Sequence, residues 1–143
     1  MTEFHPARPD FAEAVRNLHK TTPLAIDMGV TLVRVEPGGV TAEMILKPEF
    51  TQQHGYAHAG TIATLADVVC GLAAYSLMDE GRSVVSININ LSLMRPAKGE
   101  KLRADGRVVK AGRKIYFTEA DIYAVDQTGE KLAAKASATM TAV

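Results

Sequence analysis

The sequence is poor in cysteine and aromatic residues, and its charges balance. It has one cysteine, Cys70, no tryptophan, and four residues each of phenylalanine and tyrosine. A single cysteine excludes an internal disulfide. Residues 1–10 contain no apolar stretch before a small-residue cleavage site, so no secretory signal is expected there. Both absences favour a reducing cytoplasm as the location.

No excess of either charge sign is present, because sixteen Lys and Arg balance sixteen Asp and Glu. We therefore expect neither a nucleic-acid partner nor an anionic membrane partner. The four histidines and one cysteine do not show metal-ligand spacing, and no phosphate-binding glycine motif occurs. We expect no metal and no cofactor. The length of 143 residues predicts a single domain spanning 1–143, in which 1–20 form an N-terminal extension with a short helix.

One long stretch, from Gly60 to Met78, is almost entirely apolar or small, and its only charged residue is Asp67. Its length permits a membrane span, but a carboxylate near its middle is unfavourable in lipid, and its Gly, Ala and Thr content lowers its hydrophobicity. A helix that is hydrophobic on every side can also form the centre of a globular domain. We therefore predict a buried central helix.

Around this helix the hydrophobic pattern has a period of two, which is typical of strands. Residues 9–20 instead have the helical spacing of a short amphipathic helix on the outside of the domain. The segments expected to be strands are Ala25–Leu32, Val40–Leu46, Val85–Leu93, Leu102–Val108, Ile115–Val125 and Leu132–Val143. The short turns between them, including Pro37–Gly39, imply mostly antiparallel pairing.

The clearest alternation lies in Val85–Leu93, where valine, isoleucine and leucine at odd positions alternate with Ser86, Asn88, Asn90 and Ser92. We expect the apolar set to share one face and the polar set the other. An apolar helix with about six strands is most simply buried if the antiparallel sheet curls around it, which describes the α+β class known as the hotdog fold. A generic α+β sheet remains an alternative on periodicity alone.

The most informative segment is QQHGYAHAG at 52–60, followed by Leu65, Ala66 and Asp67. It resembles the PaaI-like and 4-hydroxybenzoyl-CoA thioesterases, whose motif is His-Gly-Gly with an acidic residue nine positions after the His. His58 and Asp67 have that spacing, and Gln52 matches the family's Asn or Gln six positions before the His. Asn88–Gly99, ending in MRPAKG, resembles the family's next strand and turn, so the resemblance covers about residues 20–143.

The resemblance implies a hotdog acyl-CoA thioesterase in which Asp67 is the catalytic carboxylate. The family uses the backbone N–H after the His as an oxyanion donor, and that residue is Ala59 here instead of glycine. Ala59 can be this donor only if its backbone has a conformation that a residue with a Cβ can adopt. The unpaired first N–H groups of a helix suit an oxyanion, which makes Ala59 and Gly60 the candidate donors. The carboxylate can activate water or attack the thioester to form an anhydride, and both mechanisms stay open.

Other residues of the motif have two interpretations each. His58 fits a residue that fixes the loop better than a base. Gln52 binds the substrate carbonyl or caps a turn. Ser86 matches a family position that supports the acidic residue, or it belongs to a polar strand face. Asp67 itself has a structural alternative, a hydrogen bond to a neighbouring chain. Cys70 lies near Asp67 on the helix but has no basic partner in sequence that suggests a thiolate.

Four cations, Arg95, Lys98, Arg113 and Lys114, fall at strand ends or turns. Surface cations are ordinary there, but the three phosphate groups of coenzyme A need such partners, so we take all four as candidate coenzyme A contacts. Rival functions are a non-catalytic acyl-CoA or acyl-carrier binding protein, which does not need Asp67, and an acyl-thioester hydratase. A hydratase needs a catalytic histidine, and the second half of the chain has none.

The spacing of the site also makes a prediction about assembly. Ala59 and Asp67 are eight residues apart on one helix, which places them roughly 12 Å apart, too far to contact one thioester carbonyl. The family arrangement, two hotdog chains with paired sheets and opposed helices, implies that Asp67 of one chain works with Ala59 of the partner chain. We therefore expect a homodimer with two composite sites, and a dimer of dimers as a further possibility.

Overall fold

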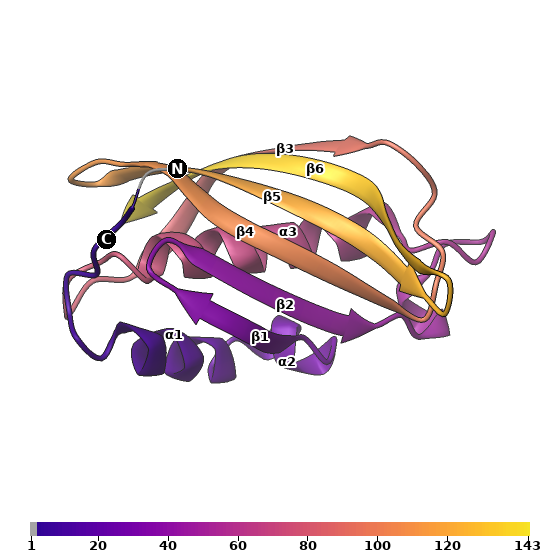
Figure 1. Cartoon of the computed structure of the whole chain (residues 1–143), viewed down its shortest axis with the longest axis horizontal. Helices are drawn as coiled ribbons and strands as arrows, with labels where there is room; N and C mark the ends of the chain where they lie inside the picture. The colour runs from indigo at the N-terminus through magenta and orange to yellow at the C-terminus, as the bar shows by residue number, and fades with distance from the viewer. Residues whose placement is uncertain (1–2) are drawn as a thin grey trace.

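The computed structural model describes residues 3–143 as one curved antiparallel sheet with a central helix lying against its concave face, as Figure 1 shows. The strands run in the order β1-β2-β4-β5-β6-β3, and every neighbouring pair is antiparallel. The helices are α1 (Phe11–Lys20), α2 (Pro23–Asp27) and α3 (Ala59–Tyr75), with a 3₁₀ turn at Pro48–Phe50. The strands are β1 (Thr31–Glu36), β2 (Gly39–Ile45), β3 (Val84–Leu93), β4 (Lys101–Ala111), β5 (Ile115–Asp126) and β6 (Gly129–Ala142). The predicted six-stranded sheet around one helix is confirmed.

The central helix α3 forms where the long apolar run predicts it, starting one residue earlier and ending at Tyr75. Leu65, Ala66, Val69 and Cys70 are all buried against the sheet. Strands β4, β5 and β6 supply the opposing surface through alternating positions that are buried along most of their length. This alternation is the one that the sequence predicts for a strand with one face on the core. In residues 3–143, no helix is long and apolar enough to cross a membrane.

Small residues line the inner face of the sheet where α3 lies. Ala104, Gly106, Ala120, Ala136 and Ala138 are all on buried positions of β4, β5 and β6. At Gly106 a Cβ atom would come within 2.5 Å of the carbonyl oxygen of Val69, which is backbone that cannot move aside locally. Glycine is therefore required at this position, and the helix packs directly on the strand backbone.

The predicted strand at Ala25–Leu32 is wrong in its first half. Residues 23–27 form the short helix α2, and the strand begins only at Thr31. Pro23 occupies the first helical turn, where its fixed φ is favourable, and Gly29 at φ +72 reverses the chain after the helix. Ala25 and Met28 are buried three positions apart, a helical spacing that coincides with an apparent alternation over a few residues.

The predicted faces of β3 are confirmed for residues 88–93 but are wrong for Val85 and Ser86, which precede a bulge. A bulge between Ser86 and Asn88 shifts the register against β6, so that Ser86 pairs with Met140 and Ile89 pairs with Ala138, both on the buried face of β6. Paired residues point to the same side, so Ser86 shares the inner face with Ile89 and the later odd positions. Val85 instead lies on the outer face, opposite Thr141. One extra residue therefore exchanges the two faces at the start of the strand, before the bulge.

Candidate active site

Asp67 projects from the middle of α3 toward β3, where Ser86 meets it. The Ser86 hydroxyl donates to the Asp67 Oδ1 at 2.5 Å, and the carboxylate is only partly buried. The bulge of β3 is what turns Ser86 to the inner face next to the helix. One carboxylate oxygen is thus held by a hydroxyl, while Oδ2 has no hydrogen-bond partner in residues 3–143.

The first turn of α3 is organised by His58. Its Nδ1 accepts the N–H of Gly60 at 2.8 Å, and its own carbonyl accepts from Thr61 and Ile62. This cap uses the Gly60 donor but leaves the N–H of Ala59 without an acceptor anywhere in the described chain. Ala59 also has a negative φ, because no residue other than glycine is found at positive φ within 3–143. A Cβ is therefore accommodated at Ala59, and one exposed N–H at the positive end of a helix is available.

Gln52 closes the loop that precedes α3. Its Oε1 accepts the N–H groups of His54 at 2.5 Å and of Tyr56 at 3.4 Å. The side chain therefore does cap a turn, as one interpretation of the sequence has it. Its amide Nε2 has no acceptor in residues 3–143, and Gln52 lines the same cavity as Ala59. The loop contacts orient the side chain without using its donor group.

The two halves of the predicted catalytic constellation line separate cavities of the chain. Asp67 and Ser86 border a cavity of about 190 Å³ between α1, α3 and β3. Gln52 and Ala59 border another, of about 380 Å³, together with Met94 and Arg95. The two cavities have no lining residue in common. Within one chain, the carboxylate and the backbone donor therefore face different spaces.

The four predicted coenzyme A contacts do not form one cluster in a single chain. Arg95 and Lys98 border a shared cavity of about 430 Å³ next to the β5–β6 turn. Arg113 and Lys114 lie in the β4–β5 turn, at the other end of an eleven-residue strand, roughly 33 Å away. All four side chains are exposed. The structure thus divides the cations into two pairs at opposite ends of the sheet.

Cys70 is one turn from Asp67 but belongs to the core. Its side chain is fully buried against the sheet. Burial raises the pKa of the Cys70 thiol to about 11. A thiol in that state is a poor nucleophile at neutral pH, so Cys70 is not a candidate nucleophile.

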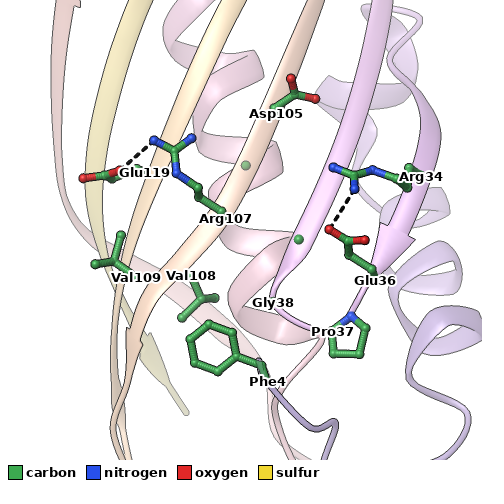
Figure 2. Close-up of a pocket in the computed structure, with 12 residues that line it drawn as sticks. Phe4, Arg34, Glu36, Pro37, Gly38, Asp105, Arg107, Val108, Val109 and Glu119 are labelled. Carbon is green, nitrogen blue, oxygen red and sulfur yellow. Dashed lines mark hydrogen bonds and ion pairs between the residues drawn. The ribbon is translucent and has the colours of Figure 1, made fainter. Parts of the chain in front are cut away.

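A larger cavity, of about 580 Å³, lies on the outer face of the sheet and contains none of the predicted site residues. Figure 2 shows Arg34 and Arg107 on its two sides, each turned toward a glutamate, with Phe4 and Pro37 at the lower end. The Arg34–Glu36 and Arg107–Glu119 distances are 2.8 and 2.7 Å. Both guanidinium groups are therefore already paired, which disfavours this cavity as a phosphate site.

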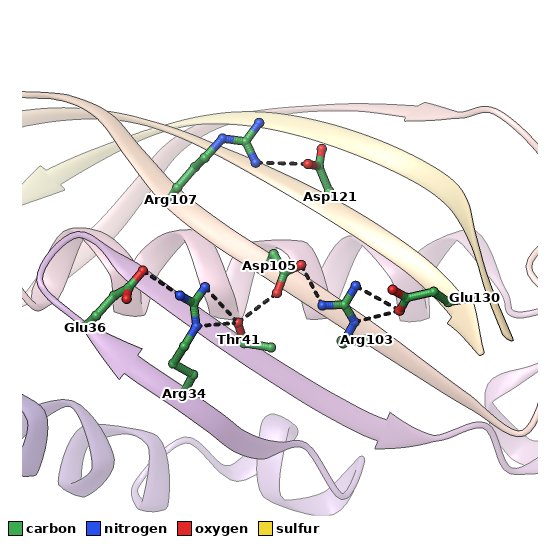
Figure 3. A network of polar contacts seen from close by, with 8 residues as sticks. All are labelled: Arg34, Glu36, Thr41, Arg103, Asp105, Arg107, Asp121 and Glu130. Atoms are coloured by element: carbon green, nitrogen blue, oxygen red, sulfur yellow. Dashed lines mark hydrogen bonds and ion pairs between the residues drawn. The ribbon is translucent and has the colours of Figure 1, made fainter. Parts of the chain in front are cut away.

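The same outer face carries a chain of polar contacts across three strands and the start of β6 (Figure 3). Arg34 and Asp105 both bond the Thr41 hydroxyl, and Asp105 also pairs with Arg103 at 2.9 Å. Arg103 continues the chain to Glu130 at 2.8 Å. Charges of both signs are matched pair by pair along this chain of contacts, which is typical of a solvated outer face.

Three residues next to Asp67 were not identified from the sequence. Leu18 and Thr22, from the N-terminal helical segment, and Gly71, one turn after Asp67, line the 190 Å³ cavity. Gly71 alone carries a signal in the sequence, because a glycine within a helical run is unfavourable and needs a reason. The positions of Leu18 and Thr22 depend on how α1 packs on the sheet, which no local pattern encodes.

Comparisons with known proteins agree with this architecture. The model of the thioesterase superfamily matches residues 54–131. Human acyl-coenzyme A thioesterase 13 is 36% identical over 94 residues, which cover 65% of this chain and 66% of the human protein. The proofreading thioesterase EntH of Klebsiella pneumoniae is 28% identical over 82% of this chain and 85% of its own length.

Solved structures have the same fold. A thioesterase family protein from Silicibacter pomeroyi superposes with a TM-score of 0.91 and 34% identity, covering 93% of this chain and 98% of that one. The PaaI protein of Escherichia coli, at 18% identity, has a TM-score of 0.83 over 94% of both chains and supports the fold alone. The family match, the sheet around α3 and the motif from Gln52 to Asp67 all agree, and the chain is a member of the thioesterase superfamily with the hotdog fold.

Proposed function

We propose that this chain hydrolyses an acyl-CoA thioester to a free carboxylic acid and coenzyme A, with Asp67 as the catalytic carboxylate. The observation that carries the proposal is the hydrogen bond between Asp67 and Ser86 beside a largely apolar cavity. Asp67 is the only charged residue of α3. The hydroxyl orients one carboxylate oxygen, and the other is free to act on water or on the thioester carbon. Relatives named as thioesterases support the same reaction.

Two routes to the products use the same groups. As a base, Asp67 takes a proton from water, and the resulting hydroxide adds to the carbonyl carbon. The tetrahedral oxyanion collapses by breaking the carbon–sulfur bond, and the departing thiolate takes up a proton. As a nucleophile, the carboxylate itself adds and displaces the thiolate, and water then hydrolyses the mixed anhydride. Both routes develop negative charge on the carbonyl oxygen, which the free N–H of Ala59 and the amide of Gln52 are suited to stabilise.

The site proposed for this reaction is shared between two chains. Asp67 and Ala59 of one chain border different cavities, so one thioester carbonyl cannot contact both. A homodimer in which two β3 edges pair antiparallel reverses the direction of the partner. The Leu93 end of the partner, with its Ala59 and Gln52, then lies next to the Val84 end of this chain, where Ser86 holds Asp67.

The same reversal explains the divided cations. Arg95 and Lys98 lie at the Ala59 end of a chain, and Arg113 and Lys114 at the opposite end, near the last residue of β6, since the Lys114 carbonyl accepts the N–H of Ala142. Two-fold pairing brings the first pair of one chain toward the second pair of its partner. We assign the four cations to the phosphate groups of coenzyme A on this basis.

The direct test of the carboxylate is Asp67→Asn, assayed against a panel of acyl-CoA substrates by release of free thiol. We expect kcat to fall about 10²-fold to 10⁴-fold with the fold retained, because the variant keeps the shape and loses the base or nucleophile. The matched control is Asp27→Asn, an exposed aspartate of α2, which should retain full activity. Unchanged turnover in Asp67→Asn disproves the catalytic assignment.

The shared site is tested by mixing two inactive chains. Ala59→Pro removes the N–H donor, and proline suits this position because Ala59 is the first residue of α3 and His58 already has the extended backbone that precedes proline. Refolding Ala59→Pro with Asp67→Asn should restore one functional site in each mixed dimer. Ala59→Gly keeps the donor and should be active alone. Mixtures that dimerise but stay inactive contradict the shared site.

A further inference from the structure

The cavity beside Asp67 is lined largely by parts of the chain that the catalytic motif does not include. Its walls are Val68 and Leu72 of α3, Val84 of β3, and Leu18 and Thr22 of the N-terminal helical segment. Apart from Thr22, whose hydroxyl donates to the carbonyl of Leu18, these walls are apolar. An apolar cavity with a carboxylate and a hydroxyl at one end suits a molecule with one reactive end and an apolar remainder.

Gly71 occupies the wall next to Asp67, one helical turn further along the same face of α3. Glycine is the least favourable residue in a helix interior apart from proline, so its presence needs a reason. The backbone does not supply one, because Gly71 is not at positive φ. Packing does not supply one either, because a Cβ at Gly71 would have no atom within 4 Å. This distinguishes Gly71 from Gly106, where a Cβ would collide with the backbone of α3.

We infer that Gly71 and Leu18 set the size of the acyl group that the enzyme accepts, with Gly71 keeping open the space beside Asp67 and Leu18 closing its far side. The inference rests on the proposed thioesterase function and adds the specificity of the same site. The cavity of about 190 Å³ is comparable to the roughly 150 Å³ apolar cavities that hold a single benzene ring. The cavity is open to solvent on one side, so we expect this volume to limit the part of the acyl group that lies beside Asp67, which should be compact and of about the volume of one ring.

Two substitutions should change this size limit in opposite directions. Gly71→Ala places a methyl group in the cavity, and Leu18→Ala removes most of a side chain from its wall. One methylene in an apolar pocket changes discrimination about 10-fold to 200-fold. We expect Gly71→Ala to lower kcat/KM at least 10-fold for the largest acyl groups that the wild type accepts, and less than about 2-fold for acetyl-CoA. Leu18→Ala should extend the accepted series to longer chains.

The experiment measures kcat/KM over straight-chain acyl-CoAs of increasing length, with benzoyl-CoA and phenylacetyl-CoA, for the wild type and both variants. Leu24→Ala is the matched control for Leu18→Ala, because Leu24 is exposed on α2 and borders no part of this cavity. Gly71→Ala should also raise the melting temperature by about 3 °C, since alanine favours the helix and the space is free. Gel filtration of every variant accompanies the assay.

Binding of non-hydrolysable acyl-CoA thioethers, measured by calorimetry over the same acyl series, separates this inference from the proposed function. If the wild type binds compact thioethers and Gly71→Ala shifts the size limit, but no thioester is hydrolysed, the size assignment stands and the thioesterase proposal fails. If the wild type hydrolyses the series and all variants keep its profile, the function stands and this inference is wrong. Loss of the dimer in Gly71→Ala also overturns it, because the space would then belong to the partner chain.

Discussion

The two edges of the sheet are built differently. The edge strand β1 is short, carries Arg34 and Glu36, and lies next to α1 and α2. The edge strand β3 has ten residues, none of them charged, and Val85, Ile87, Ile89 and Leu93 are exposed on it. Edge strands of soluble proteins are usually protected by charges, by shortness or by a covering helix. β1 has all three protections and β3 has none, so we expect β3 to be the edge at which the proposed dimer pairs.

The difference between the two edges can be tested by adding a charge to β3. Ile87→Lys places a cation on the exposed β3 edge, and we expect it to dissociate the dimer and lower kcat/KM at least about 100-fold, because each site loses the partner's oxyanion donor. Val33→Lys is the matched control, since Val33 on β1 is 54% exposed and Ile87 is 57% exposed. Analytical ultracentrifugation and the thiol-release assay should separate the two variants. Equal behaviour would remove the distinction between the edges.

A smaller effect is expected from the contact that links the β3 edge to the helix. Ser86→Ala removes the hydroxyl from Asp67 and should lower kcat about 10-fold, equivalent to about 1.4 kcal/mol, because one carboxylate oxygen loses its orienting donor. KM should change little, since the hydroxyl acts through Asp67. Ser92→Ala, on the same strand without a hydrogen bond to its side chain in residues 3–143, is the control. A change in KM alone would indicate a substrate contact instead.

The smallest effect is expected at the protected edge. Arg34→Ala removes the ion pair with Glu36 and the contacts with Thr41, and it should lower the free energy of unfolding by about 0.5 to 1 kcal/mol, since exposed pairs contribute little. Urea denaturation at low and high salt measures this, and the loss should shrink at high salt. Lys110→Ala, an exposed cation without an ion pair in the described chain, serves as reference. Loss of the dimer on this substitution would contradict the assignment of the edges.

The sequence predicted the elements whose pattern is long and uniform. The run from Gly60 to Met78 and the alternation in β4, β5 and β6 each span eight or more residues, so chance agreement is small. The signal failed at α2, where Ile26, Met28 and Val30 alternate by coincidence, although Pro23 and Gly29 do bound a short helix. It failed again at the start of β3, where a one-residue bulge exchanges the faces of Val85 and Ser86 without any mark in the hydrophobic pattern.

The residues of the candidate site also fall into two groups, those that a local sequence pattern predicts and those that depend on tertiary packing. The spacing of Gln52, His58 and Asp67 along one loop and one helix is local, so the resemblance identifies these residues directly. Leu18, and the separation of the cations at the ends of β4, depend on tertiary packing. The role of His58 as the cap that occupies Gly60 and leaves Ala59 free follows only from the geometry of the helix terminus.

The close approach of Gly106 to the backbone of α3 fixes the distance between the helix and the sheet. The sheet presents Ala104, Gly106 and Ala120 to the helix, and at Gly106 the strand and the Val69 carbonyl are so close that no Cβ fits between them. Asp67 is only two residues from Val69, so the distance of its carboxylate from the sheet depends on the absence of a side chain at Gly106. We therefore expect that a single methyl group added at Gly106 would push α3 away from the sheet and move Asp67 within the proposed active site.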